Sequence, residues 1–599
     1  MSASATKSIH GSDYHPHNPW YFFTTGSDLN YALRTSLAGI GALLAAMYLQ
    51  FDVPRWAAWT VFVVSPPVRG SVLRKTTARV LGTLVACVVS VAGVGLFPQH
   101  ALGFYTFFTA WYAVCAYWGS LTRGFVSYGA GLAAFTTAIV VAGAPSEPQG
   151  VFFVAINRGS ATLLGVLFAL LASEVSAHSD DINGDFAHRV CAVAGELIDW
   201  AVDFLKPSAA ENGAERVQDA PVTRDILNLD ELAKNAMASR PALRWVKRWI
   251  VGLPTALLCI QTGVLSIGRS SDDEMTGWVR QAMRDLGELI RSGAETSIAE
   301  LQKRCSSLSR LAEHLEKQPR ENAGRLALME IVSGLRYFVA CIESILMLKE
   351  PILPPTIGYP PPQFLPRRAV AMANALAAFL GIGCAYFIWD ATAWNEGSAF
   401  VTYVAVAVVL FLALDDPVTA SRVCVVATLF GAAVALLAKY FLLPWFNNPI
   451  WLSVLLFALV FPAVWLETKP RLAPFGILFV NAQMVLLAPT NPQHYNLEQD
   501  INGLVVFVTA FYFVSLVFLL VSPPRTGQAR IDYLLHLMRR QLARLQNRPV
   551  LTADARLRWE TQMYDAVQKV QMVSKAAESR TAAVGVLLAG HRAIDGVEP

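Results

Sequence analysis

Long apolar runs, separated by short polar stretches, fill two regions of this chain and leave a polar segment between them. Each region holds about six runs, which cover 31–50, 55–66, 80–97, 102–119, 125–143 and 153–173, then 369–389, 397–414, 423–442, 450–466, 472–488 and 501–521. A helix needs roughly 20 apolar residues to cross the hydrocarbon core of a bilayer. The pattern therefore predicts an all-α integral membrane protein with about twelve spans, in which the short run 55–66 depends on tilted or buried neighbours.

The polar segments predict helices outside the membrane. Amphipathic patterns recur in 173–366, for example over 283–316, and this segment ends in a proline-rich linker over 351–366. Residues 249–267 are apolar enough to cross a membrane, but Pro254 and Gln261 favour a helix buried inside the domain, and both readings stay open. The predicted order is a polar tail, a first bundle, a helical domain, a second bundle and a helical tail, over 1–28, 29–174, 175–366, 367–522 and 523–599.

The distribution of Lys and Arg predicts how the chain lies in the membrane. Basic residues gather in alternate loops, over 67–79, 120–124, 415–422 and 467–471, whereas the intervening loops carry few. By the positive-inside rule, the basic loops, both termini and the middle domain are cytoplasmic, which agrees with an even number of spans. Both sets of runs then start on the same side, so the two six-helix bundles are predicted to be parallel repeats with a substrate path between them.

Composition narrows the class of protein. Only 15% of the 599 residues are charged, against about 25% in a soluble protein, and the formal net charge of +4 gives no indication of nucleic-acid binding. The eight cysteines have neither a disulfide framework nor zinc-site spacing. Because the chain has no Walker A and no Gly-x-Ser-x-Gly motif, neither an enzyme nor a resident cofactor is expected.

One stretch of the first region combines aromatic, proline and basic residues. It carries the pattern W-x2-W-T-x5-P-x3-G-x4-K-x3-R-x2-G-T over 56–83. Tryptophan favours the membrane–water boundary, and proline ends a helix because it lacks the N–H and clashes with the preceding turn. An aromatic half-span, a proline break and a basic loop that leads into a small-residue helix indicate an element that handles anions in a membrane.

This pattern resembles the fusaric acid resistance (FUSC) family, and the predicted layout of spans agrees with that family over nearly the full length. The resemblance implies a bacterial inner-membrane exporter of aromatic carboxylic acids, of the fusaric acid or p-hydroxybenzoate type. It also implies a periplasmic adaptor and an outer-membrane channel as partners. The fold is similar to that of plant aluminium-activated malate transporters, anion channels in which two six-span subunits pair, so a homo-oligomer stays open.

Seven cations are candidates for binding an organic carboxylate: Arg34, Arg69, Lys75, Arg79, Arg123, Arg158 and Arg368. An arginine fork matches a carboxylate and keeps its charge in low dielectric. Arg158 lies inside an apolar run, where an arginine is costly unless it faces a bundle interior or water. Trp59 and Tyr128 are candidates for contact with an aromatic ring. The alternatives are topology signals and lipid-headgroup contacts for the cations, and interfacial positions for the aromatic residues and Arg158.

Two adjacent acids are candidates for coupling to a proton gradient. Asp415 and Asp416 stand before Pro417 in the second region, at the place where the first region has Ser65-Pro66-Pro67. Adjacent carboxylates repel each other and burial disfavours their charge, so one of them could carry a proton near neutral pH. The alternative is a solvated helix end at which Asp416 caps the next helix.

Three functions remain open at this level. The first is a proton-driven exporter of aromatic carboxylates, and the second is a passive organic-anion channel. The third is a membrane scaffold whose cytoplasmic domain binds a protein partner. The first is preferred because cations and acids are predicted in pseudo-equivalent loops of the two bundles.

Overall fold

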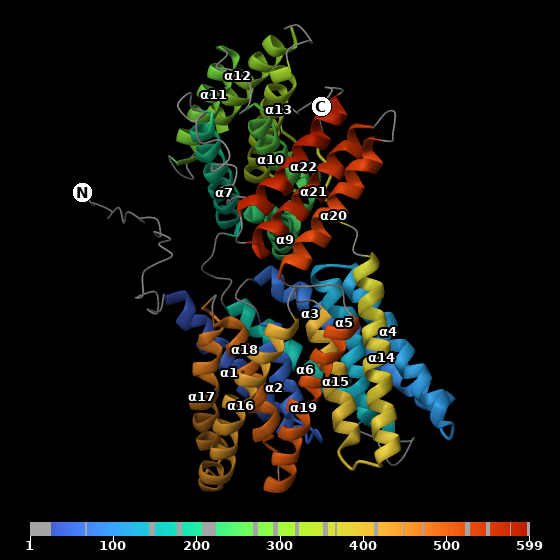
Figure 1. Cartoon of the computed structure of the whole chain (residues 1–599). Helices are drawn as coiled ribbons and strands as arrows, with labels where there is room; N and C mark the ends of the chain where they lie inside the picture. Colours follow the sequence, from blue (N-terminus) through green and yellow to red (C-terminus); the bar gives the residue numbers. More distant parts are fainter. Residues whose placement is uncertain are drawn as a thin grey trace, which may run out of the picture.

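The computed structural model describes residues 26–595 except 66–68, 143–149, 176–181, 206–222, 268–273, 292–297, 318–322, 352–357, 366–367, 413–416, 447, 470–471, 491, 522–526, 547–551 and 575–576. Every regular element in these described ranges is a helix. Figure 1 shows two layers, with one group of helices above and a longer, roughly parallel group below. The upper layer is called the helical domain and the lower layer the membrane layer.

The first set of apolar runs forms the first half of the membrane layer. Its helices are α1 (Gly26–Tyr48), α2 (Arg55–Val64), α3 (Arg69–Leu96), α4 (Ala101–Leu121), α5 (Gly124–Ala142) and α6 (Gly150–Val175). Each predicted run falls in one of these helices. The basic segment expected to be a loop over 67–79 is different, because α3 already begins at Arg69. Its 28 residues span about 42 Å, so the basic turns extend the helix beyond the hydrocarbon core.

The second set of runs forms the other half of the layer. Its helices are α14 (Arg368–Thr392), α15 (Gly397–Leu412), α16 (Pro417–Leu437), α17 (Pro449–Leu466), α18 (Ala473–Leu487) and α19 (Leu497–Val521). α16 continues into a π-helical turn, η4 (Ala438–Leu442), and a short 3-10 turn, η5 (Leu443–Trp445). The π turn holds Lys439, which is buried and pairs with Asp500 of α19 at 2.7 Å.

Helix packing follows the same order in the two sets. α4 packs on α14 and α5 on α15, while the corresponding helices α17 and α18 pack on α1 and α2. Within the sets, α3 packs on α5 and α6, as α16 packs on α18 and α19. This correspondence is what a parallel repeat predicts, although the twelve-span reading itself stays a prediction. Each of two hydrophobic cores of the layer contains residues from both sets, so the two sets are packed together rather than separate.

The helical domain combines the middle segment with the C-terminal tail. Its helices are α7 (Ile182–Phe204), α9 (Thr223–Ser239), η3 (Pro241–Val246), α10 (Lys247–Ile267), α11 (Glu274–Arg291), α12 (Ile298–Glu316), α13 (Ala323–Met347), α20 (Gly527–Gln546), α21 (Ala553–Val573) and α22 (Ala577–Asp595). One hydrophobic core joins them, with residues from Phe186 to Leu588. The tail expected as a separate segment therefore completes this domain.

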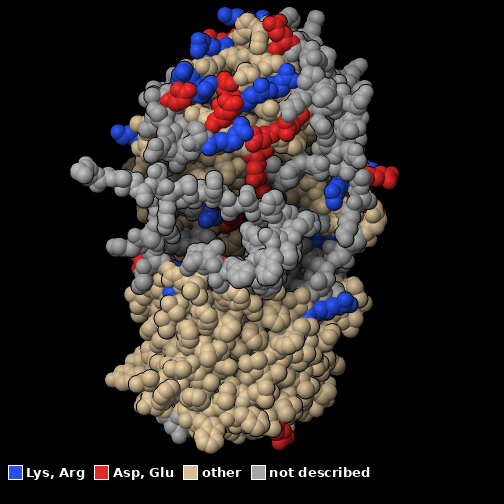
Figure 2. All heavy atoms as spheres, turned by 90° about the vertical axis from the view of Figure 1, so that its left-hand side faces the viewer, with Lys and Arg blue, Asp and Glu red and all other residues tan. Residues whose placement is uncertain are grey.

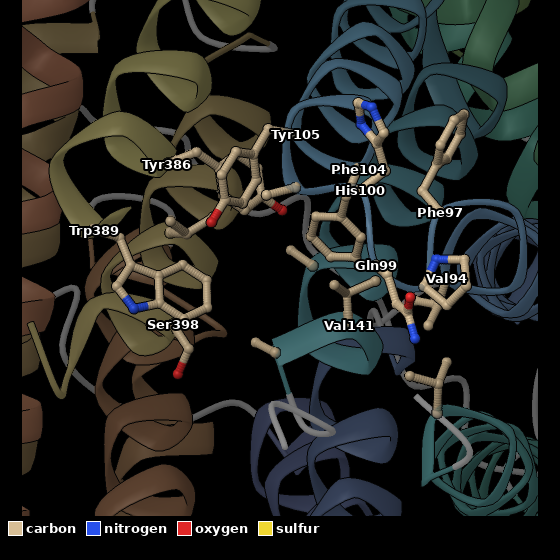
Figure 3. A pocket seen from close by; sticks show the side chains of 16 residues that line it. Val94, Phe97, Gln99, His100, Phe104, Tyr105, Val141, Tyr386, Trp389 and Ser398 are labelled. Atoms are coloured by element: carbon tan, nitrogen blue, oxygen red, sulfur yellow. The ribbon is translucent and has the colours of Figure 1, made fainter. Parts of the chain in front are cut away.

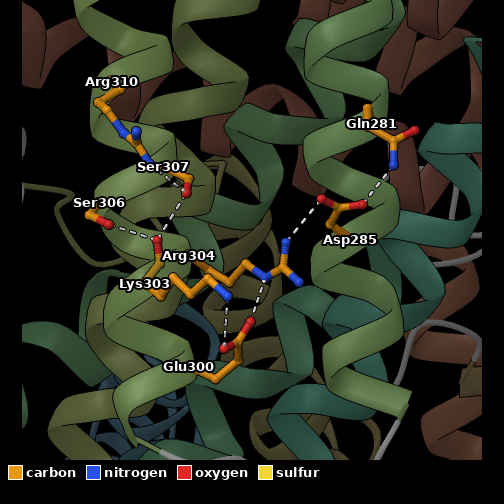
Figure 4. A network of polar contacts seen from close by, with 8 residues as sticks. All are labelled: Gln281, Asp285, Glu300, Lys303, Arg304, Ser306, Ser307 and Arg310. Atoms are coloured by element: carbon orange, nitrogen blue, oxygen red, sulfur yellow. Dashed lines mark hydrogen bonds and ion pairs between the residues drawn. The ribbon is translucent and has the colours of Figure 1, made fainter.

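A polar network links two exposed helices of the domain. Arg304 of α12 contacts Asp285 of α11 at 2.9 Å and Glu300 of its own helix at 3.2 Å, as Figure 4 shows. Exposed pairs of this kind contribute about 0–1 kcal/mol each. The apolar faces of α11 and α12 therefore account for most of their attachment, and Met283 and Leu308 lie in the shared core.

Eight helices in the described ranges are long and apolar enough to cross a membrane. Seven of them lie in the membrane layer, where 28–50% of each apolar window is buried inside the protein. The eighth covers 241–267, and 89% of its window is buried in the helical domain, where α10 packs along α13. Figure 2 shows that charged side chains gather on the helical domain, whereas the visible face of the membrane layer is almost free of them. The chain is a membrane protein.

Candidate functional site

The short helix α2 brings two tryptophans into the interior of the first set. Their rings lie 4.9 Å apart at Trp56 and Trp59, and the Trp59 ring also meets the edge of Phe135 of α5 at 6.0 Å. Pro54 precedes the helix, and Thr60 donates its hydroxyl to the Trp56 carbonyl within it. The aromatic residues of α2 therefore face α5 and α6 rather than only the membrane boundary.

Arg79 of α3 lies against this aromatic face and is 1% exposed. Its guanidinium donates to the hydroxyl of Tyr128 at 3.1 Å and to that of Thr60 at 3.2 Å, and it lies 5.4 Å from the Trp59 ring centre. Its Nε atom is buried without a hydrogen-bond partner among the described residues. Both of these partners are neutral hydroxyls, so among the described residues the charge of Arg79 is solvated by dipoles and rings and not by a carboxylate.

Arg158 of α6 is the second buried cation beside the two tryptophans of α2 and is 3% exposed. Its guanidinium lies 3.9 Å from the Trp56 ring centre and 5.3 Å from that of Trp59. Its Nε and Nη1 atoms have no hydrogen-bond partner in the described part of the chain. Burial of an unpaired charge is costly, so a guanidinium held in this state favours an anion that can complete its hydrogen bonds.

Two further cations lie next to these aromatic rings, so that cations and rings alternate in a row. Lys75, one turn before Arg79, places its ammonium 5.5 Å from the Tyr128 ring centre, and Arg55 lies 5.8 Å from that of Trp56. We call this row the cation–aromatic ladder, and it comprises Lys75, Tyr128, Arg79, Trp59, Arg158, Trp56 and Arg55. Among the described residues, neither Arg79 nor Arg158 has an ion pair with a carboxylate. The ladder is thus a positively charged, aromatic-walled interior.

Glycines let the helices that carry the ladder approach closely. A Cβ on Gly165 of α6 would clash with the Ala57 carbonyl and the Thr60 side chain of α2, so only glycine permits this contact. A Cβ on Gly82 of α3 would lie 2.7 Å from the Gly129 carbonyl oxygen of α5. These two contacts fix Arg158 against the tryptophans and Arg79 against Tyr128.

The structure gathers five of the residues predicted from sequence: Trp59, Lys75, Arg79, Tyr128 and Arg158. It places three others elsewhere: Arg34, Arg368 and Arg123. Arg34 is half-buried over the ring of Tyr31, and Arg368 is exposed at the start of α14. The side chain of Arg69 and both Asp415 and Asp416 lie outside the described residues. Whether the gathered residues bind a substrate stays a prediction.

Arg123, predicted to lie on the pathway, serves a different contact. Its guanidinium is 3.2 Å from the carboxylate of Asp565 in α21 and 3.6 Å from the Phe364 ring centre. The Asp565 carboxylate also accepts a hydrogen bond from the Leu365 backbone N–H at 3.0 Å. Arg123 therefore joins the membrane layer to the helical domain, since it lies in the turn between α4 and α5 that faces the domain.

Sequence reasoning missed Glu467, which directly follows α17. Its Oε2 accepts a hydrogen bond from the Tyr31 hydroxyl at 3.1 Å, while its Oε1 is buried without a partner in the described ranges. Burial raises the pKa of Glu467 to about 8, although the hydrogen bond from Tyr31 and the charge of Lys75 oppose this rise. The available signal was a single acid at the end of an apolar run, next to a lysine-containing loop.

The second set has no equivalent of the ladder at the matching positions. Gly431 of α16 approaches the Phe479 carbonyl of α18 just as Gly82 approaches that of Gly129, which aligns the two helix pairs. Counting from these glycines, Thr428 stands where the first set has Arg79, and Cys424 stands where it has Lys75. At these two positions the second set therefore carries no positive charge.

Comparison with known proteins gives a consistent set of relatives. Residues 28–595 match the fusaric acid resistance protein family. The chain is similar to the p-hydroxybenzoic acid efflux pump subunit AaeB of Musicola paradisiaca (strain Ech703), with 21% identity over 538 residues that cover 85% of this chain and 78% of the relative. It is similar to the subunit of the same name from Edwardsiella ictaluri (strain 93-146), with 24% identity over 534 residues, 84% of this chain and 79% of the relative.

Proposed function

Since this chain belongs to the fusaric acid resistance protein family, we propose that it exports aromatic carboxylic acids from the cell through the cation–aromatic ladder. The family membership that the pattern over 56–83 predicted is confirmed. The relatives are named as efflux pump subunits for p-hydroxybenzoic acid, which supports an acid of that type as the substrate. The observation that carries the proposal is the pair of buried guanidinium groups, of Arg79 and Arg158, that have no carboxylate partner among the described residues.

The chemistry of the ladder fits a flat anion. A carboxylate between Arg79 and Arg158 would accept the hydrogen bonds that their Nε atoms leave open. The ring attached to it would lie against Trp59, whose face is within 6 Å of both guanidinium groups. An aromatic acid would therefore contact the two guanidinium groups through its carboxylate and Trp59 through its ring. An aliphatic acid would make only the contacts with the guanidinium groups.

A proton gradient would drive export if a group on the pathway changed its charge. Glu467 is a candidate in the described ranges, because its charge acts on Lys75 at the end of the ladder. Ionisation of Glu467 changes the electrostatic potential at the ladder and hence the affinity for an anion, which biases a two-state equilibrium. Asp415 and Asp416 remain proposals for the same role.

Accumulation of radiolabelled p-hydroxybenzoate in cells tests the proposal. We expect cells that produce the protein to retain less label, and the variants Arg79→Ala and Arg158→Ala to lose this effect. Thr428→Ala, at the position of the second set that matches Arg79, is the control and should export like the parent. Export by both arginine variants at the parental rate would contradict the proposal. Loss of export with a protonophore would support proton coupling, and unchanged export would remove it.

The row of cations in the ladder also fits the second candidate function, a passive organic-anion channel. Recordings of the purified protein in planar bilayers separate the two: channel-sized unitary currents with benzoate favour the channel, and their absence together with uptake into vesicles favours the transporter.

The proposed setting is a bacterial inner membrane, with both termini and the helical domain in the cytoplasm. The word "subunit" in the relatives' names supports partners, which we propose to be a periplasmic adaptor and an outer-membrane channel. Copurification of an adaptor with a single membrane anchor would test the partner. A cysteine introduced near the C-terminus should be protected from a membrane-impermeant thiol reagent in intact cells, which would test the orientation.

A further inference from the structure

A cavity, separate from the ladder, lies at the end of the membrane layer that is remote from the helical domain. It has a volume of about 430 Å³ and is lined by residues of α3 to α6 together with α14 and α15. It thus lies between the two sets of helices. Ala101, which begins α4, lines the cavity, whereas Arg123 just beyond the other end of α4 contacts the helical domain. The size falls within the range of small-molecule sites, roughly 300–1,000 Å³.

Stacked aromatic rings form one wall of this cavity. Tyr105 and Tyr386 stack with ring centres 4.9 Å apart, and Tyr386 stacks on Trp389 at 6.3 Å. Phe104 meets the edge of Tyr386 at 6.3 Å. Figure 3 shows these side chains beside an open space, with His100 and Gln99 across from Trp389. Such a wall offers ring faces and edges to a flat ligand, and aromatic pairs prefer these geometries.

The cavity recognises a ring and not a carboxylate. Among its sixteen described lining residues, none is Lys, Arg, Asp or Glu. The nearby Asp390 accepts a hydrogen bond from the Tyr105 hydroxyl at 3.1 Å, which places an acid at the cavity's edge. Apart from the imidazole of His100, the described lining therefore offers an anion no basic side chain, and Asp390 repels an anion at the edge, in contrast to the ladder.

One face of α5 leads from the ladder to the cavity. Tyr128 lies on the ladder, Phe135 packs against Trp59 of the ladder, and Ala138 and Ala142 line the cavity. These positions are separated by seven, three and four residues, so they share one helix face. α6 repeats the arrangement, with Arg158 on the ladder and Val151 two turns away on the cavity wall. Phe135 and Ala138 are one turn apart, so the two sites adjoin.

We propose that this cavity is a second binding site for the exported acid, which holds its aromatic ring after the carboxylate has left the ladder. This inference rests on the proposed export of aromatic acids. The ladder binds the anion tightly by charge, and the cavity binds the ring weakly while the edge acid disfavours the carboxylate. A substrate that moves along α5 thus passes from a high-affinity to a low-affinity site, which favours release at the end remote from the helical domain.

Photolabelling of the full-length protein in lipid nanodiscs tests the second site. The probe is 4-azidobenzoate, and adducts are mapped by mass spectrometry. We expect adducts on the segment with Trp389 and on the segment with Arg158. Benzyl alcohol, which has a ring but no carboxylate, should lower the Trp389 adduct roughly fivefold or more and spare the Arg158 adduct. Hexanoate, which has a carboxylate but no ring, should do the reverse.

Either of two results overturns the proposal: no adduct on the cavity wall, or a cavity adduct that hexanoate removes and benzyl alcohol does not. The readout is independent of transport. A labelled cavity in a protein that exports no acid would contradict the proposed function and leave the ring site standing. Export without a cavity adduct would contradict only the second site.

A substitution that fills the cavity tests whether the cavity is needed for export. Ser398 lines the cavity, so Ser398→Phe fills it without removing an aromatic wall residue. Thr106→Phe is the matched control, because Thr106 is exposed on α4 beside Tyr105 but does not line the cavity. We expect Ser398→Phe to lower export severalfold while its Arg158 adduct persists, which shows that the variant is folded. Parental export by Ser398→Phe would overturn the proposal.

Discussion

Arg158 owes its buried position to aromatic faces rather than to a counter-ion. A guanidinium stacks on indole rings and is weakly hydrated, which reduces the cost of removing it from water. A lysine ammonium is compact, strongly hydrated and cannot present a fork. The geometry at 3.9 Å from Trp56 therefore requires arginine in particular, and not simply a positive charge.

Arg158→Lys is the corresponding test at the residue scale. The variant keeps the charge but loses the fork and the stacking, so we expect the affinity for p-hydroxybenzoate to fall about tenfold to hundredfold, the equivalent of one charged hydrogen bond. Equilibrium binding of the labelled acid to purified protein measures this change. Arg368→Lys, at an exposed position, is the control and should bind like the parent. Equal binding by both variants would show that only charge matters at Arg158.

Glu467 makes the ladder sensitive to pH. Its pKa is raised to about 8, mainly by burial, so the carboxyl is neutral below that pH and charged above it. A negative charge near Lys75 competes with a bound anion, so we expect the affinity for the aromatic acid to fall as pH rises through about 8. The acid itself stays ionised over this range. Titration of binding with pH measures the effect.

We expect the affinity of Glu467→Gln for the aromatic acid to be independent of pH over this range. It should equal the affinity of the parent protein with Glu467 protonated. Glutamine keeps the hydrogen bond from Tyr31 and cannot ionise. Export by this variant should also become insensitive to a protonophore. A parental pH dependence in Glu467→Gln would assign the titration to another group.

At the scale of elements, α3 connects the helical domain directly to the ladder. Arg74 pairs with Glu231 of α9 at 2.9 Å and donates to Asn235 at 2.8 Å, and the next residue, Lys75, begins the ladder. Arg79 follows one turn later on the same helix. Because Arg74, Lys75 and Arg79 lie on one continuous helix, a displacement of the helical domain would also displace Lys75 and Arg79.

Charge reversal tests this connection. Arg74→Glu and Glu231→Arg each place like charges together, and we expect each to lower export roughly two- to fivefold, because partly exposed pairs contribute about 0.2–1 kcal/mol. The double variant restores the pair in the opposite sense and should recover most of the loss. Export assays together with thermal unfolding separate coupling from stability. Loss without recovery in the double variant would contradict a role for the pair.

The elements of the membrane layer were predictable because runs of apolar residues are local signals. Each of the predicted runs corresponds to one helix of the layer, with the run 423–442 continuing from α16 into η4, and the short run 55–66 became α2. The start of α3 was not predictable in this way, because its first turns are basic and read as a loop. The ladder depends on contacts among α2, α3, α5 and α6, so sequence could nominate Arg79 and Arg158 but could not show that Trp59 lies between them. The contact of Arg123 was not predictable for the same reason, since its partner Asp565 lies far along the chain.

At the scale of the whole molecule, the helix packing is nearly repeated but the charge is not. The matching positions of Arg79 and Lys75 hold Thr428 and Cys424, both buried. A repeated scaffold with charge on one side gives an anion a single preferred wall. In the second set, the buried Lys439 is paired with Asp500 at the π turn that ends α16.

A second link between the layers, besides the one through Arg74, is centred on a buried acid. Asp565 is 2% exposed and holds Arg123 of the membrane layer, Lys569 of its own helix and the Leu365 backbone N–H. Burial alone would raise the pKa of Asp565, but the charges of Lys569 and Arg123 and the hydrogen bonds hold it below its usual value. A lowered pKa means that the stabilisation is fully present above about pH 4, the unfolded value, and is lost only as pH falls through the lower folded value.

Asp565→Asn should therefore loosen the junction at neutral pH. It leaves Arg123 and Lys569 without their shared carboxylate, and removal of one partner from a buried ion pair costs about 3–5 kcal/mol, less here because Arg123 is partly exposed. We expect a lower unfolding temperature and faster hydrogen exchange at Leu365, while the core of the helical domain stays protected. Asp532→Asn, at an exposed acid of α20, is the control. If exchange at Leu365 were the same in both variants, the junction would be held by its apolar contacts, with Phe364 foremost, and not by the acid.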